Sequence, residues 1–138
     1  MSHTCKALVI RCMDFRIKPS VLSALLEKEG YLEGNFDTVS LAGAAKCLLS
    51  DKPGESEMLF TQIELSKKLH CISEIVVLYH DNCGAYGIAD LSAEEKTQLA
   101  DLALVKAKIN DRYPDLGVKL YIIKGVPSGK LSLSPVKI

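Results

Sequence analysis

The chain has 138 residues, and its 17 Lys and Arg balance its 17 Asp and Glu to give a formal net charge of zero. This length predicts a single domain over residues 1–138 with one ordinary hydrophobic core. The charges are balanced and scattered along the chain, which disfavours binding to nucleic acid or to an anionic membrane surface. We therefore expect a small-molecule ligand.

The apolar stretch from Ala7 to Ile10 lies between Lys6 and Arg11. It is too short for a signal sequence or a membrane span, and we expect a cytoplasmic protein. The five cysteines are odd in number and spread over the chain, which favours reduced thiols or metal ligands over a disulfide framework.

Short apolar runs alternate with helical patterns along the chain. In chain order, the pattern predicts a strand over 6–12, a helix from 19 to about 30, a strand over 39–41, a helix over about 55–69, a strand over 75–79, a helix over about 93–113 and a strand over 118–123. Ser92 is the expected N-cap of the last helix, and Pro114 ends it. A Ser-Gly turn signal then precedes 130–133, which could fold back as a short antiparallel edge strand.

This alternation predicts an α/β fold with a mainly parallel sheet of about four strands, flanked by helices on both faces. Ligands of such sheets bind beyond the carboxyl ends of the strands, where the strand order reverses. Polar or glycine-containing segments follow three of the strands: 12–16, 42–43 and 80–84. If the strand over 6–12 lies beside the strand over 75–79, the first and last of these segments meet.

Cys12, His80 and Cys83 together offer two sulfurs and one nitrogen to a metal ion. Zinc binds such ligands tetrahedrally, and a catalytic zinc site uses three protein ligands and leaves the fourth position for water or substrate. We assign the remaining cysteines, Cys5, Cys47 and Cys71, structural roles. His70 precedes the strand over 75–79 and should lie at the opposite edge of the sheet, which argues against a second metal site there.

The segment Cys12-x-Asp14-x-Arg16 resembles the Cys-x-Asp-x-Arg motif of the β-class carbonic anhydrases, and His80-x-x-Cys83-Gly84 resembles the His-x-x-Cys-Gly motif of that family. The order and the wide separation of the two motifs also match. The resemblance implies Zn²⁺ on Cys12, His80 and Cys83, with Asp14 and Arg16 as the dyad next to the metal. It also implies the reversible hydration of CO2 to bicarbonate and a proton, with zinc activating the attacking water.

The position of Asp14, two residues from a ligand, allows it either to bind zinc or to accept a hydrogen bond from a water on zinc. Arg16 can hold the carboxylate off the metal in a bidentate pair. On the other interpretation, the two residues form an ordinary surface ion pair. Met13 and Phe15 alternate with the polar residues and should point to the interior or line an apolar wall.

Two departures from the family pattern leave other functions open. Ser40-Leu41 stands where the family commonly has Arg-Asn, and the chain contains no Trp. The alternatives are a related CS2 or COS hydrolase and a non-catalytic zinc-stabilised module for binding or assembly. A pocket at the edge of so small a sheet should need a wall from a second subunit, so we expect a homodimer or a multiple of dimers.

Overall fold

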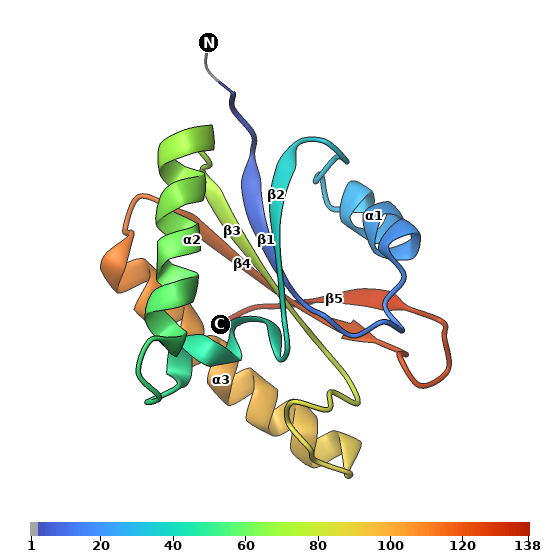
Figure 1. The fold of residues 1–138 in the computed structure, drawn as a ribbon. Coiled ribbons are helices and arrows are strands. Elements are labelled where there is room, and N and C mark those ends of the chain that lie inside the picture. Colours follow the sequence, from blue (N-terminus) through green and yellow to red (C-terminus); the bar gives the residue numbers. More distant parts are fainter. Residues whose placement is uncertain (1–2) are drawn as a thin grey trace.

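The computed structural model describes residues 3–138. Along the chain, its elements are β1 (Ala7–Cys12), α1 (Pro19–Lys28), β2 (Phe36–Leu41), the short 3-10 helix η1 (Ala44–Leu49), α2 (Glu55–His70), β3 (Glu74–His80), α3 (Leu91–Arg112), β4 (Gly117–Lys124) and β5 (Ser132–Val136) (Figure 1). The other helices and the strands β1, β3 and β4 agree closely with the predicted ranges, whereas β2 begins three residues before its predicted start, β5 is displaced toward the C-terminus and η1 was not predicted.

The strands form one sheet in the order β2-β1-β3-β4-β5. β1 pairs in parallel with β2 and with β3, and β3 pairs in parallel with β4. β5 pairs antiparallel with β4. The predicted α/β fold with an antiparallel edge strand is therefore confirmed, although β5 begins and ends later than the predicted range. Pro135 is compatible with this strand because β5 lies at the edge of the sheet.

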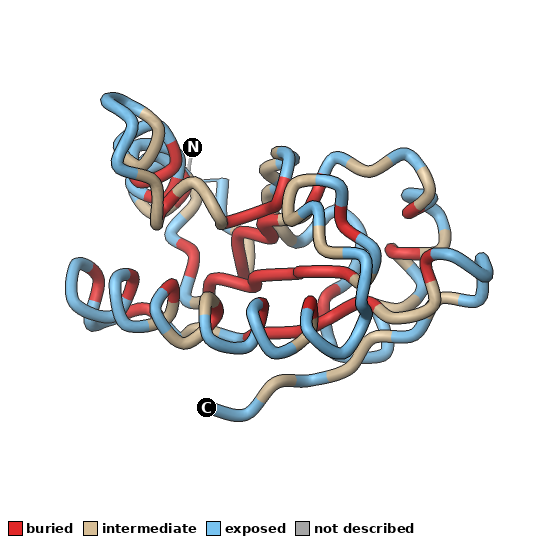
Figure 2. Tube along the Cα trace, turned by 90° about the horizontal axis from the view of Figure 1, so that it is seen from below, coloured by how far each residue is buried: buried red, intermediate tan, exposed pale blue. Residues whose placement is uncertain are grey.

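Helices cover both faces of the sheet, and each face has its own apolar core. α1 packs on one face, where Leu22 and Leu26 meet Val9, Val76 and their neighbours. η1, α2 and α3 pack on the other face, against the alternate side chains of the same strands (Figure 1). The buried residues accordingly run along the strands and the inner sides of the helices (Figure 2).

The central strands are more deeply buried than the edge strand β2. Every residue of β3 after Glu74 is buried, whereas Thr38 and Ser40 of β2 are exposed and Val39 is only half-buried. The sequence pattern predicted this strand from a short apolar run over 39–41. Its polar residues are accommodated because β2 pairs with β1 alone among the described strands.

The longest helix, α3, buries one face that includes Leu102, Val105 and Ile109. The prediction that Ser92 caps this helix is wrong. Asp90 is the N-cap: its backbone is extended, and its carboxylate accepts a hydrogen bond from the Ala93 amide at 3.2 Å, while Ser92 lies within the first turn. Within residues 3–138, none of the helices combines the length and the apolar character that crossing a membrane requires.

Candidate metal centre

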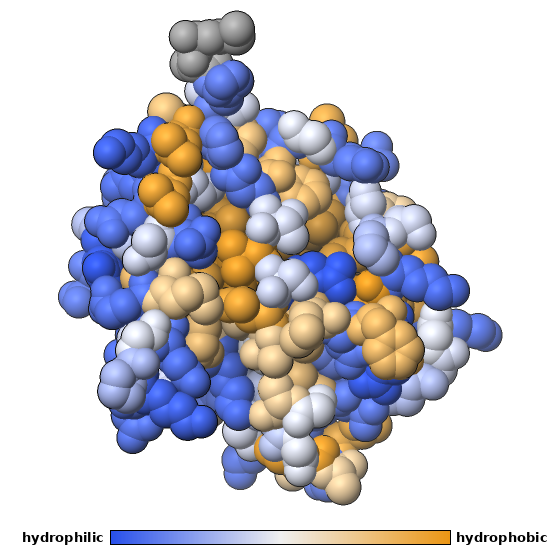
Figure 3. Space-filling model, in the orientation of Figure 1, coloured by the Kyte–Doolittle hydropathy of each residue, from blue (hydrophilic) through white to orange (hydrophobic). Residues whose placement is uncertain are grey.

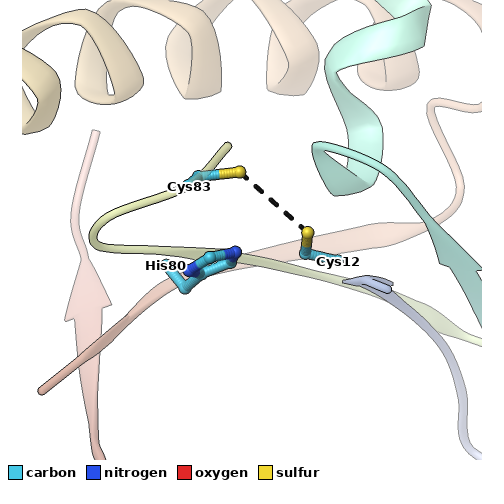
Figure 4. Close-up of side chains that lie close together, drawn as sticks. All are labelled: Cys12, His80 and Cys83. Carbon is cyan, nitrogen blue, oxygen red and sulfur yellow. Dashed lines mark hydrogen bonds between the residues drawn. The ribbon is translucent and has the colours of Figure 1, made fainter. Parts of the chain in front are cut away.

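The pairing of β1 with β3 brings the two sequence motifs together. Cys12 is the last residue of β1, His80 is the last residue of β3, and Cys83 lies in the loop that follows β3. Strand order reverses at this point, because the chain continues from β1 to β2 on one side while β3 and β4 lie on the other. The three side chains point toward one another in the space beyond the strand ends (Figure 4).

The distances among these residues fit one metal ion. The two sulfurs are 4.0 Å apart, and the sulfurs and a ring nitrogen of His80 all lie within 4.8 Å of one another. Two sulfurs at about 2.3 Å from a tetrahedral zinc would be separated by about 3.8 Å. All three residues are buried, with exposed fractions of 6% for Cys12, 1% for His80 and 5% for Cys83.

The hydrogen bonding of His80 fixes which nitrogen is available. Nδ1 lies 2.7 Å from the backbone carbonyl oxygen of Asp81, which can only accept, so Nδ1 donates and Nε2 carries the lone pair. Nε2 is buried and has no hydrogen-bond partner among the described residues. A buried nitrogen without a partner is costly, and a carbonyl-bound Nδ1–H is the usual support for a metal-binding imidazole. The residues therefore fit a metal.

Without a metal ion, the surroundings of Cys12 and Cys83 favour a single negative charge on this pair of sulfurs. The hydrogen bond shared with Cys83 lowers the pKa of Cys12, and the same bond raises the pKa of Cys83. Burial opposes the charged form of His80, but the nearby Cys12 sulfur raises the pKa of this histidine overall. A divalent cation among these groups would keep both sulfurs as thiolates.

Asp14 lies beside this cluster and is held by Arg16. One carboxylate oxygen of Asp14 accepts hydrogen bonds from the backbone amide and Nε of Arg16 at 2.9 and 3.0 Å, and the other accepts from the second guanidinium nitrogen at 2.7 Å. The hydrogen bonds from Arg16 lower the pKa of Asp14 to about 2. The second oxygen of Asp14 is 3.8 Å from Nε2 of His80. The bidentate pair expected from the sequence is thus present.

Arg16 also ties the loop after β1 to the loop after β3. Its two terminal nitrogens donate to the side-chain and backbone oxygens of Asn82 at 2.8 and 2.9 Å. Asn82 has a positive φ of 55°, a conformation that asparagine adopts more readily than most residues. A single guanidinium therefore orients both Asp14 and the residue next to Cys83.

Two buried polar residues of α3 support the loop from the other side, and sequence reasoning missed both. Glu94, 1% exposed, accepts hydrogen bonds from the backbone amides of Asn82 and Cys83 at 2.6 and 2.8 Å. Gln98, also 1% exposed, donates to the carbonyl oxygen of His80 at 2.8 Å. The signal was available, because both residues continue the apolar stripe of α3 toward its N-terminus.

The turn after β2 contacts the same loop. Lys46 of η1 donates to the carbonyl oxygen of Ala85 at 2.7 Å. Gly43 has a φ of 75°, and a Cβ at this position would lie 3.1 Å from the Cβ of Ala85. The Ala42-Gly43 segment thus needs a glycine both for its backbone conformation and for its close approach to the loop.

An open groove of about 880 Å³ adjoins the cluster, with Asp14, Arg16 and Cys83 among its lining residues. Met13 and Phe15 line it as well, and both are exposed, at 62% and 88%. They form an apolar wall rather than part of the interior. Tyr86 does not line this groove: its ring packs on Tyr79, and its hydroxyl donates a hydrogen bond to Asp101 at 2.7 Å.

Comparison with known proteins places the chain in a family. The family model described as "Putative carbonic anhydrase" matches residues 2–126. An uncharacterised protein of Rickettsia conorii is 37% identical over 124 residues, which cover 84% of this chain and 66% of that protein. The chain thus spans just under two thirds of the length of this relative.

The fold is similar to that of solved β-carbonic anhydrases. A carbonic anhydrase from Glaciozyma antarctica aligns with a TM-score of 0.61 at 15% identity, covering 96% of this chain and 83% of that one. A Sordaria macrospora structure, described as one of two tetrameric β-carbonic anhydrases, aligns with a TM-score of 0.54 at 12% identity, covering 99% and 84%. The chain therefore belongs to this carbonic anhydrase family and has the β-carbonic anhydrase fold.

Proposed function

We propose that the protein is a zinc-dependent carbonic anhydrase that hydrates CO2 reversibly to bicarbonate and a proton. Cys12, His80 and Cys83 would hold the zinc. One observation carries this proposal: two buried sulfurs and a buried nitrogen without a hydrogen-bond partner converge beside a carboxylate that an arginine holds in place.

Zinc in such a site supplies a Lewis acid that lowers the pKa of a bound water toward about 7. Asp14 would accept a hydrogen bond from the reacting water and so orient it toward the substrate. Arg16 binds both oxygens of Asp14 and so holds the carboxylate beside the three ligands, 3.8 Å from Nε2 of His80, in a position to accept that hydrogen bond. Met13 and Phe15 offer an apolar surface suited to CO2, which is itself apolar.

The Asp14–Arg16 pair favours an enzyme over a non-catalytic zinc module. A structural zinc site is closed by four protein ligands and needs no oriented carboxylate. Here the described residues bring three ligands together, and Asp14 is tied to Arg16 through both of its oxygens. The pairing with Arg16 keeps the Asp14 carboxylate near the metal position without making it a ligand. The fourth coordination position can then stay open for water or substrate.

Stopped-flow measurement of CO2 hydration, on protein whose zinc content has been determined, tests this proposal. We expect a rate above that of buffer which scales with zinc content and falls strongly in Asp14→Asn. Full zinc occupancy without any rate above buffer would contradict it and leave the non-catalytic module. Hydrolysis of CS2 or COS without hydration of CO2 would show that the protein is the related hydrolase and not a carbonic anhydrase.

We also infer that a second copy of the chain covers the groove. Phe15 is 88% exposed and Met13 62% exposed beside the metal centre, and large apolar side chains exposed together favour an interface. Other apolar areas are scattered over the face seen in Figure 1, among polar ones (Figure 3). The Sordaria relative of this fold is described as tetrameric. A dimer or a multiple of dimers would enclose the groove.

A further inference from the structure

A second cluster of metal-binding side chains lies at the opposite end of the sheet from the candidate zinc centre. Cys5 precedes β1, Asp37 lies near the start of β2 and His70 is the last residue of α2. One ligand atom from each of these three residues lies within 4.8 Å of the other two. The position predicted for His70 is correct, but this position does not argue against a second metal site, because Cys5 and Asp37 lie at the same edge of the sheet.

The two clusters are independent sites. The five steps of β1 from Ala7 to Cys12 alone span about 16 Å, since a strand rises about 3.3 Å per residue. Cys5 lies beyond the start of that strand, whereas Cys12 ends it. A metal ion at one cluster therefore cannot touch a ligand of the other.

Backbone pairing fixes the second cluster in place. The amide of Cys5 donates to the carbonyl oxygen of His70 at 3.0 Å, which joins the start of the chain to the end of α2. Asp37 is set opposite Leu8 by the register of β1 and β2. The three ligands thus come from segments that the fold already holds together, so binding a metal would require side-chain rotation without a backbone rearrangement.

The side chains are oriented by further hydrogen bonds. One oxygen of Asp37 lies 2.6 Å from Nδ1 of His70 and accepts a hydrogen bond from the hydroxyl of Ser66, also at 2.6 Å. The side chains of Asp37 and His70 are 30% and 35% exposed. The cluster is therefore ordered and still open to solvent, as a site that takes up an ion must be.

The contacts of Cys5 favour a metal ligand over a cysteine nucleophile. A nucleophile of this kind needs a hydrogen bond to its histidine base. The Cys5 sulfur donates a weak hydrogen bond to the carbonyl oxygen of Ala7 at 3.7 Å, and in the described part of the chain it has no hydrogen bond to His70. Ligand atoms around a tetrahedral zinc are about 3.3 to 3.8 Å apart. The three ligand atoms here lie within 4.8 Å of one another, and zinc would replace the 2.6 Å hydrogen bond between Asp37 and Nδ1 of His70, moving these two atoms to about 3.3 Å apart.

We propose that Cys5, Asp37 and His70 form a second Zn²⁺ site. The metal would link three segments: the residues that precede β1, the strand β2 and the end of α2. The ligand set of one sulfur, one oxygen and one nitrogen is of the kind that zinc accepts, and a fourth position is left for water. This site is separate from the proposed catalytic centre and does not depend on carbonic anhydrase activity.

The test counts zinc ions per chain after exhaustive dialysis, in the wild type and in matched variants. We expect two ions in the wild type and one in each of Cys5→Ser, Asp37→Asn and His70→Gln. Cys83→Ser would lose the other ion, and Cys5→Ser with Cys83→Ser would lose both. If Cys83→Ser keeps both ions while Cys5→Ser loses one, the proposed catalytic site fails and the second site stands.

Cys71 provides the control, because it is an exposed thiol directly after His70. Cys71→Ser should keep both ions. One ion per wild-type chain would overturn the proposal, and so would two ions that persist in all three variants, or loss of the second ion in Cys71→Ser.

A second measurement uses the wild-type protein and so does not depend on the folding of any variant. The protein is first stripped of metal, and alkylation by iodoacetamide is then followed residue by residue by mass spectrometry while zinc is added back beyond the first equivalent. Zinc should protect Cys5 and leave Cys71 reactive, because a thiolate bound to metal is a poorer nucleophile. Equal reactivity of Cys5 with and without the additional zinc would overturn the proposal.

Discussion

Glu94 supports the loop that carries Cys83, a proposed zinc ligand, by accepting hydrogen bonds from two backbone amides. Replacing Glu94 tests this support without changing a proposed ligand. Glu94→Ala removes the acceptor for the amides of Asn82 and Cys83, which it binds at 2.6 and 2.8 Å. Leaving a buried donor without a partner costs about 1–3 kcal/mol. The amide of Cys83 is buried and that of Asn82 partly so, and we therefore expect a loss of about 2–4 kcal/mol in unfolding free energy.

The same change should weaken zinc binding, because the two amides flank a ligand. Loss of a group that orients a metal ligand typically lowers metal affinity about 10–100-fold. Glu94→Gln retains one acceptor oxygen and should fall between the wild type and Glu94→Ala. The assays are urea unfolding of the metal-free protein and competition for zinc with a chromophoric chelator.

The adjacent Glu95 gives a matched control. Its carboxylate pairs with Lys124 at 3.1 Å, and both side chains are nearly half exposed. A surface pair contributes about 0–1 kcal/mol, so Glu95→Ala should change stability little and zinc affinity not at all. If Glu94→Ala behaves like Glu95→Ala in both assays, the reasoning about the loop is wrong.

Three other predictions concern the metal and the groove. Arg16→Ala should keep zinc but lower CO2 hydration about 10–100-fold, since Asp14 would be free to bind the metal. Adding Asp14→Ala should reopen the fourth position, as X-ray absorption can show, and wild-type activity in Arg16→Ala would refute this role of Arg16. Cys83→Ser should lose the catalytic zinc and lower the thermal midpoint, because the site joins β1 to β3; a fully loaded variant would show that Cys83 is not a ligand. Phe15→Ser should shift the assembly toward monomer in light scattering, whereas Leu104→Ser, which changes an exposed leucine of α3, should not; an active wild-type monomer at micromolar concentration would count against the interface.

Much of the fold could be predicted because the apolar pattern is nearly unambiguous. β1 and β3 are short, continuous apolar runs, as buried parallel strands are, whereas Leu102, Val105 and Ile109 recur at the spacing of one helical face. The cap of α3 was placed two residues too late. Asp90 and Ser92 are both good capping residues, and only the backbone geometry decides between them.

The 3-10 helix η1 escaped prediction for a different reason. Ala44–Leu49 is a short apolar segment whose six residues are too few to show a helical period. Its conformation depends on tertiary contacts, such as the hydrogen bond from Lys46 to Ala85, that the sequence does not reveal.

The neighbouring positions of Cys12, His80 and Cys83 could be predicted, because strand ends in a parallel sheet share one edge. The support of their loop by Glu94 and Gln98 could not be predicted in detail. Polar residues on a buried helical face indicate that a partner exists, but the partner here lies in a loop more than ten residues away. The cluster of Cys5, Asp37 and His70 was missed because its members are isolated in the sequence and meet through the register of β1 and β2 and the hydrogen bond from Cys5 to the end of α2.

X-ray absorption at the zinc edge tests the central claim most directly. We measure it on the wild type and on Cys5→Ser, which isolates the candidate catalytic centre. The account predicts two sulfur ligands at about 2.3 Å, one imidazole nitrogen and one further light atom from water in Cys5→Ser. A spectrum without two sulfur ligands, or one unchanged by Cys12→Ser, would contradict the assignment of zinc to Cys12, His80 and Cys83.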